Sequence, residues 1–124
     1  MNRSILVAVG GMFGSLARYW LSGAVQQLTG SEFPFGTLSV NVLGGFILGL
    51  VASLSFERGL LSQEVRLLLG VGFCGGFTTM SAFSYETLAL IREGSSLSAF
   101  WNVGATIVVC FTSVWLGDVL GRII

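Results

Sequence analysis

The segment from Gly70 to Tyr85, GVGFCGGFTTMSAFSY, combines glycines and hydroxyl side chains within an otherwise apolar stretch. Four glycines fall in it, and each costs about 1 kcal/mol relative to alanine inside a helix. Backbone that leaves a helix at membrane depth is tolerated only where protein or a wet cavity receives its N–H and C=O groups. We therefore expect a helix broken near Gly75–Thr79 that lines a path for a small polar species. The hydroxyls along it belong to Thr78, Thr79, Ser81 and Ser84.

Asn41 is an amide side chain in the middle of a second apolar stretch, FGTLSVNVLGG. A buried amide needs partners for two donor hydrogens and for its oxygen. Two interpretations stay open: the amide holds helices together, or it offers its N–H groups to a dehydrated anion. Thr37 lies one helical turn earlier on the same face, so the two side chains could form a polar ladder.

Further candidate groups lie in the last two apolar stretches. Phe83 carries a ring whose edge is electropositive, and Glu86 follows three residues later. Asn102, Thr106 and Cys110 recur at i, i+4 and i+8, which places them on one helix face. Such a stripe either bonds helices together or lines a pathway. We favour the pathway, because it would join the other polar positions.

Arg18 is a charged side chain inside the first apolar stretch. A charge within the membrane costs about 2.5–3.5 kcal/mol on insertion scales and by default marks function. One interpretation is that the side chain snorkels to the interface, since Tyr19 and Trp20 are typical of an interfacial belt. The other is a fixed positive charge that attracts anions to a vestibule.

The composition is that of a membrane protein. Of 124 residues, 53% are apolar and 10% are charged, whereas soluble domains carry roughly 25% charged residues. All cations are arginines without a basic patch, which argues against a nucleic-acid partner. The chain has no histidine, and Cys74 and Cys110 are expected to be small packing residues. The chain offers neither a metal-ligand set nor a nucleophile–base pair, so nothing in the sequence indicates an enzyme.

Four stretches are long enough to cross a bilayer, which takes about 20 mostly apolar residues. They are residues 4–28, 34–56, 65–91 and 97–123. Their separators are short, so neighbouring helices must run antiparallel. The first stretch continues past Arg18 without a convincing cleavage site, and we expect it to be retained rather than removed as a signal peptide. The sequence therefore predicts an all-α membrane protein with four transmembrane helices in a single channel domain, residues 1–124.

Four thin helices enclose too little space to wall a polar pathway, so we expect an oligomer, most simply a dimer. Glycines spaced four apart let helices approach closely, either within one chain or between two. The arginines show only a small bias between the two sides of the membrane, and this bias sets orientation. The chain could therefore insert both ways and pair as an antiparallel, dual-topology homodimer. The glycine pairs are Gly10/Gly14, Gly45/Gly49 and Gly117/Gly121.

The polar positions favour a small anion over a cation. No carboxylate lies at the centre of any of the four stretches, and apart from Glu86 the candidate residues offer donors. One alternative is a small four-helix multidrug exporter, which should carry a glutamate deep in its first span, where this chain has none. Another is a non-transporting scaffold subunit, which would need neither Asn41 nor a broken third span.

These residues resemble the Fluc family of fluoride channels over essentially the whole chain. The resemblance rests on GGxxGSxxRY in the first stretch, GTLSVNVLGG in the second and GFCGGFTTMSAFSYE in the third. It implies an antiparallel homodimer with two parallel pores in the bacterial inner membrane. Such a protein exports fluoride passively and thereby lowers its concentration in the cytoplasm.

The resemblance also implies roles for single residues. Asn41 would donate to fluoride and Phe83 would turn its ring edge to the ion. The backbone carbonyls of Gly75 and Thr78 from both copies would hold a structural Na⁺ at the dimer axis, a coordination that suits a hard cation. From the residues and the resemblance together, the expected pore set is Asn41, Phe83, Met80, Ser81, Thr37, Thr79, Asn102, Thr106 and Glu86, with Arg18 as a vestibule charge.

Two positions depart from the family pattern, which is close to TTFSTF. Met80 replaces the first phenylalanine, and Ala82 replaces a hydroxyl residue. Methionine is polarizable but has no electropositive ring edge, and alanine removes a donor. We expect these changes to weaken conduction, as in an engineered variant, and to leave the fold and the dimer intact.

Overall fold

The computed structural model describes residues 2–124, and all the regular secondary structure within them is helical. The first two rods are α1 (Arg3–Thr29), followed by α2 (Phe35–Ala52) with its π-helical extension η1 (Ser53–Glu57). The third rod is composite: α3 (Gln63–Arg66), the π-helix η2 (Leu67–Cys74), α4 (Gly75–Phe77) and α5 (Met80–Arg92). The last rod is α6 (Ser96–Ile123).

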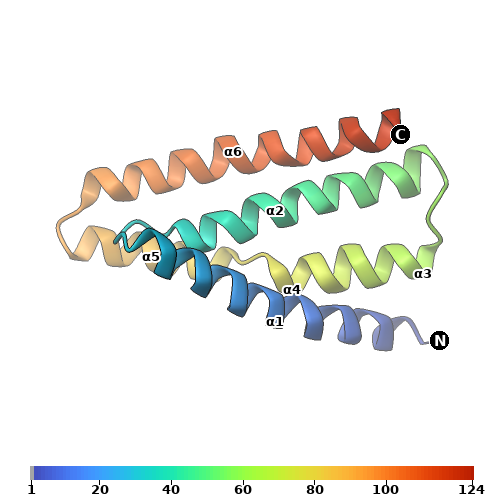
Figure 1. Cartoon of the computed structure of the whole chain (residues 1–124), viewed down its shortest axis with the longest axis horizontal. Coiled ribbons are helices and arrows are strands. Elements are labelled where there is room, and N and C mark those ends of the chain that lie inside the picture. Colours follow the sequence, from blue (N-terminus) through green and yellow to red (C-terminus); the bar gives the residue numbers. More distant parts are fainter. Residues whose placement is uncertain (1) are drawn as a thin grey trace.

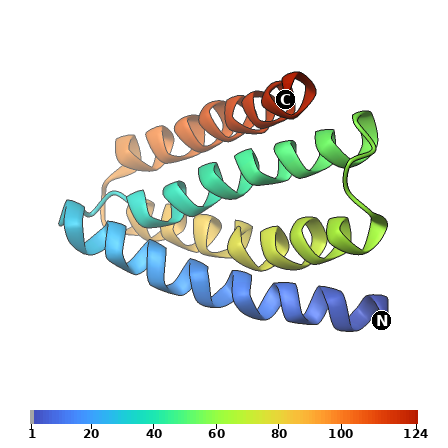
Figure 2. The same cartoon turned by 45° about the vertical axis from the view of Figure 1, so that its right-hand side comes forward.

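The four rods lie side by side, and successive rods run in opposite directions (Figures 1 and 2). Their order across the molecule is α6, α2, the third rod and α1, with both termini at one end (Figure 1). All four rods are long and apolar enough to cross a membrane, at residues 3–29, 35–57, 63–92 and 96–123. The prediction of an all-α, four-span membrane protein is therefore confirmed.

The helix ends follow local capping chemistry. The Asn2 side chain accepts a hydrogen bond from the Ser4 N–H at 2.8 Å and so caps the start of α1. Glycines with positive φ lie in each of the three connections, because that backbone region is strained for other residues. These are Gly30 at φ 57°, Gly59 at φ 62° and Gly94 at φ 81°.

Glycine also sets how closely the rods pack. A Cβ added to Gly14 of α1 would lie 2.1 Å from the Phe73 carbonyl oxygen of η2, and one on Gly117 of α6 would lie 2.1 Å from the Phe46 oxygen of α2. Only glycine permits such backbone contact. All three glycine pairs singled out in the sequence face backbone or side chains of the same chain. These close contacts therefore lie within one chain and do not require a second copy.

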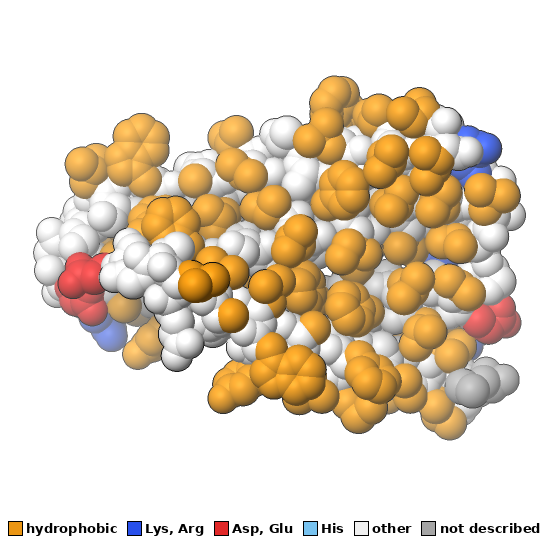
Figure 3. Space-filling model, in the orientation of Figure 1, with side chains coloured by type: hydrophobic (Ala, Val, Ile, Leu, Met, Phe, Trp, Pro, Cys, Tyr) orange, Lys and Arg blue, Asp and Glu red, His pale blue; other side chains and the backbone are white. Residues whose placement is uncertain are grey.

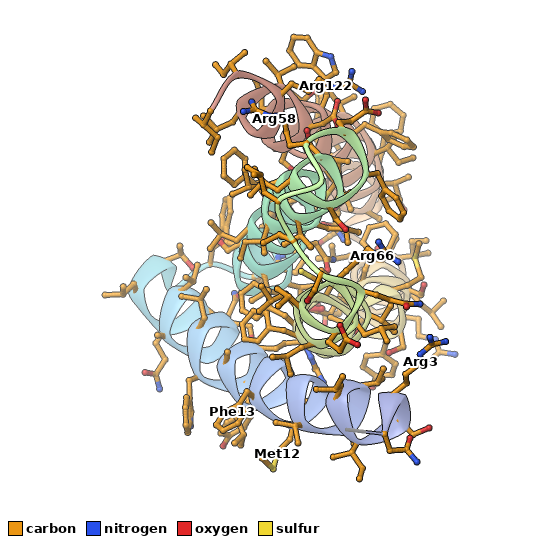
Figure 4. All side chains as sticks on the ribbon, turned by 90° about the vertical axis from the view of Figure 1, so that its right-hand side faces the viewer. Arg3, Met12, Phe13, Arg58, Arg66 and Arg122 are labelled. Atoms are coloured by element: carbon orange, nitrogen blue, oxygen red, sulfur yellow. The ribbon has the colours of Figure 1, made fainter. Side chains whose placement is uncertain are left out.

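The molecule has little interior of its own. Its buried apolar side chains are few, while large apolar side chains are exposed along every rod. They cover most of the visible surface, and the charged side chains lie toward the two ends (Figure 3). Lipid or a second protein chain must cover such a surface. The end that carries both termini holds Arg3, Arg58, Arg66 and Arg122 (Figure 4).

Candidate functional site

The third rod breaks at two residues within the predicted segment. Thr78 (φ −92°, ψ 159°) and Thr79 (φ −153°, ψ 116°) are extended, between the end of α4 and the start of α5. The Thr78 N–H and hydroxyl both donate to the Cys74 carbonyl, at 3.0 and 2.9 Å. The π-helix η2 precedes α4, the short turn that ends at the break, and π-helical turns often accompany functional sites.

Asn41 of α2 bridges the break. Its Oδ1 accepts the Thr79 N–H at 2.8 Å, and its Nδ2 donates to the Thr79 carbonyl at 3.2 Å. An amide nitrogen carries two hydrogens, so one remains for another acceptor. The two interpretations of Asn41 are thus compatible in this geometry: the amide ties α2 to the third rod and still keeps a donor.

The start of α5 is capped by its own residues. The Thr79 hydroxyl accepts the Ala82 N–H at 3.1 Å, which satisfies one of the free amide groups of the first turn. The same hydroxyl lies 3.2 Å from the Ser81 hydroxyl. Two sets of hydrogen bonds therefore fix the backbone between α4 and α5: those from the Asn41 side chain to Thr79, and the one between the Thr79 hydroxyl and the first turn of α5.

Arg18 of α1 fixes the other side of the break. Its Nε donates to the Gly76 carbonyl at 2.9 Å, and the side chain is half-buried. A cation at the C-terminal end of a helix is favourable because the carbonyls there carry partial negative charge. Arg18 is not among the residues that line the cavity described next. It acts as a clamp between α1 and α4.

A cavity of about 560 Å³ opens beside the break. Asn41, the ring of Phe83 and the hydroxyl residue Thr106 meet in it from three different rods. The Thr106 hydroxyl is buried and has no hydrogen-bond partner within residues 2–124, so its donor is unused. Cys110 lies on the same helix face as Thr106. The predicted site residues that line the cavity are Asn41, Gly75, Thr78, Thr79, Met80, Phe83 and Thr106.

Thr37 and Glu86 meet one another outside this cavity. The Thr37 hydroxyl donates to Glu86 Oε1 at 2.5 Å, which joins α2 to α5. Thr37 lies one turn from Asn41 on α2, as expected. Glu86 lines a separate pocket of about 260 Å³ near the start of α2, together with Glu32 and Glu93. The polar ladder along α2 therefore continues from the cavity to an acidic pocket.

Asn102 and Ser81 also lie away from the cavity lining. Asn102 is 1% exposed, and its Nδ2 donates to the Thr87 hydroxyl at 2.9 Å, which ties α6 to α5. Thr87 in turn donates to the Phe83 carbonyl. Ser81 is exposed on the first turn of α5. The stripe on α6 thus divides: its first member bonds helices together, and Thr106 and Cys110 line the cavity.

Arg66 is a cavity residue that the sequence analysis did not propose for the site. It lines the cavity from α3, with Gly70 and Cys74 further along the same rod. Positions 66, 70 and 74 are spaced by four, a helical spacing that would have placed Arg66 on the cavity face once Cys74 was placed there. Arginines near span ends are typical of the membrane interface, so the residue type alone does not indicate a cavity position.

Comparison with known proteins identifies a family and close relatives of this chain. The family model described as CrcB-like protein, Camphor Resistance (CrcB), matches residues 5–118. The fluoride-specific ion channel FluC of Geobacter sulfurreducens is 46% identical over 122 residues, which cover 98% of each chain. FluC of Pyrococcus abyssi is 47% identical, again over 98% of each chain. FluC of Methylococcus capsulatus is 46% identical over 123 residues, which span 54% of that protein.

Proposed function

This chain belongs to the family of CrcB-like proteins, and we propose that it is a fluoride-selective channel through which fluoride leaves the cell passively. The relatives that match along their whole length are named as fluoride-specific ion channels. The observation that carries the proposal to this chain is the cavity at the break, whose mostly apolar walls hold a few polar side chains. Asn41 keeps one N–H and Phe83 adds a ring, whereas no carboxylate lines the cavity within residues 2–124.

The chemistry of these groups suits fluoride. Fluoride is small and strongly hydrated, so it crosses a membrane only where protein donors replace its water. Amide and hydroxyl hydrogens do so directly, and the electropositive edge of an aromatic ring adds a weaker attraction. A larger halide such as chloride would not fit a path narrow enough for this close contact. A carboxylate in the same position would repel any anion.

We propose further that two copies pair in antiparallel orientation and form two pathways. In one copy the cavity has walls from a single row of rods, and Met80, which lines it, is 72% exposed. Gly75 is also exposed, with no atom within 4 Å of an added Cβ. A second copy laid across this face would complete the walls and cover the apolar surface. Purified protein in detergent should therefore have twice the mass of one chain.

We propose that the carbonyls of Gly75 and Thr78 hold a structural Na⁺. The N–H groups of Thr78 and Thr79 donate to Cys74 and Asn41, so neither is available to the Gly75 carbonyl. The end of α4 thus keeps acceptor oxygens, which are the ligands that hard cations prefer. Two copies would supply four such oxygens. Replacing Na⁺ with N-methylglucamine should lower the dimer's melting temperature, and an unchanged value would contradict a sodium site.

The two alternative functions are less well supported. A four-helix multidrug exporter would need a membrane-embedded acid in its first span, and α1 contains none. A scaffold subunit would need neither the spare N–H of Asn41 nor a broken third rod beside a cavity. Met80 lines the cavity where the family pattern has phenylalanine, so we expect slower flux than in a protein with that phenylalanine.

Fluoride efflux from liposomes tests the proposal. Purified protein is reconstituted into liposomes loaded with potassium fluoride, valinomycin is added to carry potassium, and a fluoride electrode records release. We expect rapid fluoride release and no release from liposomes loaded with potassium chloride, followed with a chloride electrode. Protein-containing liposomes that retain fluoride as well as protein-free ones do would contradict the proposal and favour the scaffold.

A further inference from the structure

Arg66 brings a charge to the cavity. It is the only charged side chain among the cavity-lining residues of the described part of the chain, 2–124. It projects from α3 at the end of the molecule that carries both termini, between the second and third rods. There it lies apart from the Arg58 and Arg122 cluster (Figure 4). The other polar lining groups lie further along the third rod and across it on α2 and α6.

Neutral groups hold this guanidinium in place. Its Nη1 donates to the Ser55 hydroxyl at 2.9 Å, and its Cζ lies 4.4 Å from the centre of the Phe56 ring. Both partners belong to η1, so the contacts fix the side chain across the connection between the second and third rods. Within residues 2–124, no carboxylate lies within 4.0 Å of it, because both ion pairs found there belong to Arg122. The charge of Arg66 is therefore not neutralised.

An arginine in this setting attracts anions. Its charge is permanent at physiological pH, and a guanidinium has five N–H donors, of which the structure uses one here. A charge at a cavity with apolar walls focuses the electric field and raises the local concentration of the opposite ion. The remaining cations at this end are already engaged: Arg122 with acids, Arg58 with backbone carbonyls and Arg3 with Gln63.

We propose that Arg66 is the residue that collects anions at the mouth of the pathway. Here the mouth means the end of the cavity lined by Arg66 and Gly70. The inference rests on the proposed function, since it assigns Arg66 the step before fluoride reaches Asn41. In an antiparallel pair, each end of the dimer would carry one such arginine, and fluoride would meet the same charge from either side.

A purely structural role for Arg66 makes a different prediction. If the side chain only ties η1 to α3, then removing its hydrogen-bond partner should do the same damage as removing the arginine. If its charge collects anions, the loss should depend on ionic strength, because salt screens charges. The Debye length falls from about 30 Å at 0.01 M to about 3 Å at 1 M.

The experiment compares Arg66→Gln, Arg66→Lys and Ser55→Ala in the liposome assay. Fluoride is kept below saturation, and ionic strength is set with potassium gluconate at about 0.01 M and about 1 M. Arg3→Gln is the matched control, since Arg3 lies at the same end and does not line the cavity. Arg66→Gln should reduce flux about fivefold at low salt and by less than about twofold at high salt. Arg66→Lys, Ser55→Ala and Arg3→Gln should stay near the parent.

Three results would overturn the proposal. One is parent-like flux of Arg66→Gln at low salt. Another is an equal loss at both salt concentrations that Ser55→Ala reproduces, which would make Arg66 a clamp. The third needs no variant: a parent flux that does not fall as gluconate rises would show that no fixed charge limits entry. A parent that conducts no fluoride at all is distinguishable from these, because it contradicts the proposed function itself.

Discussion

Replacing Asn41 with aspartate separates the two roles of this amide. The Asp Oδ1 can still accept the Thr79 N–H that Asn41 accepts at 2.8 Å, so the start of α5 keeps its cap. The second oxygen takes the place of Nδ2, which now donates to the Thr79 carbonyl at 3.2 Å. One interhelical hydrogen bond and the spare donor are therefore lost together, and a negative charge enters the cavity.

The cost to a passing anion is large compared with the cost to the fold. The lost hydrogen bond destabilises by about 1 kcal/mol, and the new carboxylate oxygen facing the Thr79 carbonyl adds a repulsion. A unit negative charge about 4 Å from fluoride raises its energy by about 4 kcal/mol at an effective dielectric constant of 20. That energy corresponds to about a thousandfold lower occupancy, since each 1.4 kcal/mol is a factor of ten. Flux should fall below detection in a protein that still folds.

The assay is fluoride efflux from liposomes, with the elution volume of the same preparation as the measure of folding. Asn41→Ala is the companion variant, because it removes both hydrogen bonds and adds no charge. It should destabilise the protein by about 2 kcal/mol and leave more residual flux than Asn41→Asp. Parent-like flux from well-folded Asn41→Asp would refute the reasoning, because fluoride would then not pass this side chain.

Three further predictions follow from the same structure. Gly14→Ala should destabilise the protein by about 2–3 kcal/mol, because its Cβ would lie 2.1 Å from a carbonyl oxygen. Gly23→Ala is the control, because its Cβ meets no atom within 4 Å. Equal melting temperatures of the two variants would contradict the packing. Asn102→Ala should lower the stability by about 1–3 kcal/mol, since Asn102 donates to Thr87 away from the cavity. The fluoride flux per folded dimer should not change. A lower flux in a protein that is still stable would show that Asn102 belongs to the pathway. Met80→Phe combined with Ala82→Thr should raise fluoride flux, because a ring edge and a hydroxyl are restored; a decrease would show that the methionine is the better lining here.

The spans and the break could be predicted because their signals are local. A membrane-crossing helix is specified by length and apolarity, and four glycines with adjacent hydroxyls mark where a helix is weak. The structure breaks the third rod at Thr78 and Thr79, inside the expected segment. The three glycine pairs could be recognised as close contacts, but not assigned to one chain or two, because spacing alone does not say which surface they meet.

The side-chain partners could not be predicted, because they depend on where rods cross. Asn102 and Thr106 share a face of α6, yet only Thr106 lines the cavity. Two residues four positions apart lie about 6 Å apart along a helix. Over that distance, the part of the third rod beside α6 changes from the middle of α5 to the break that precedes α5. Arg18 likewise donates to Gly76, a contact between distant parts of the chain. The π-helical segments η1 and η2 have no residue signature that the sequence analysis could have used.

The central claim is that two copies of this chain conduct fluoride and exclude chloride. Its most direct test is the reversal potential across a planar bilayer containing the purified protein, with equal concentrations of sodium fluoride on one side and sodium chloride on the other. Current should reverse far from zero, at a voltage that corresponds to preference for fluoride. A reversal potential at zero, in a membrane that carries protein-dependent current, would mean that the donors around Asn41 do not select the ion.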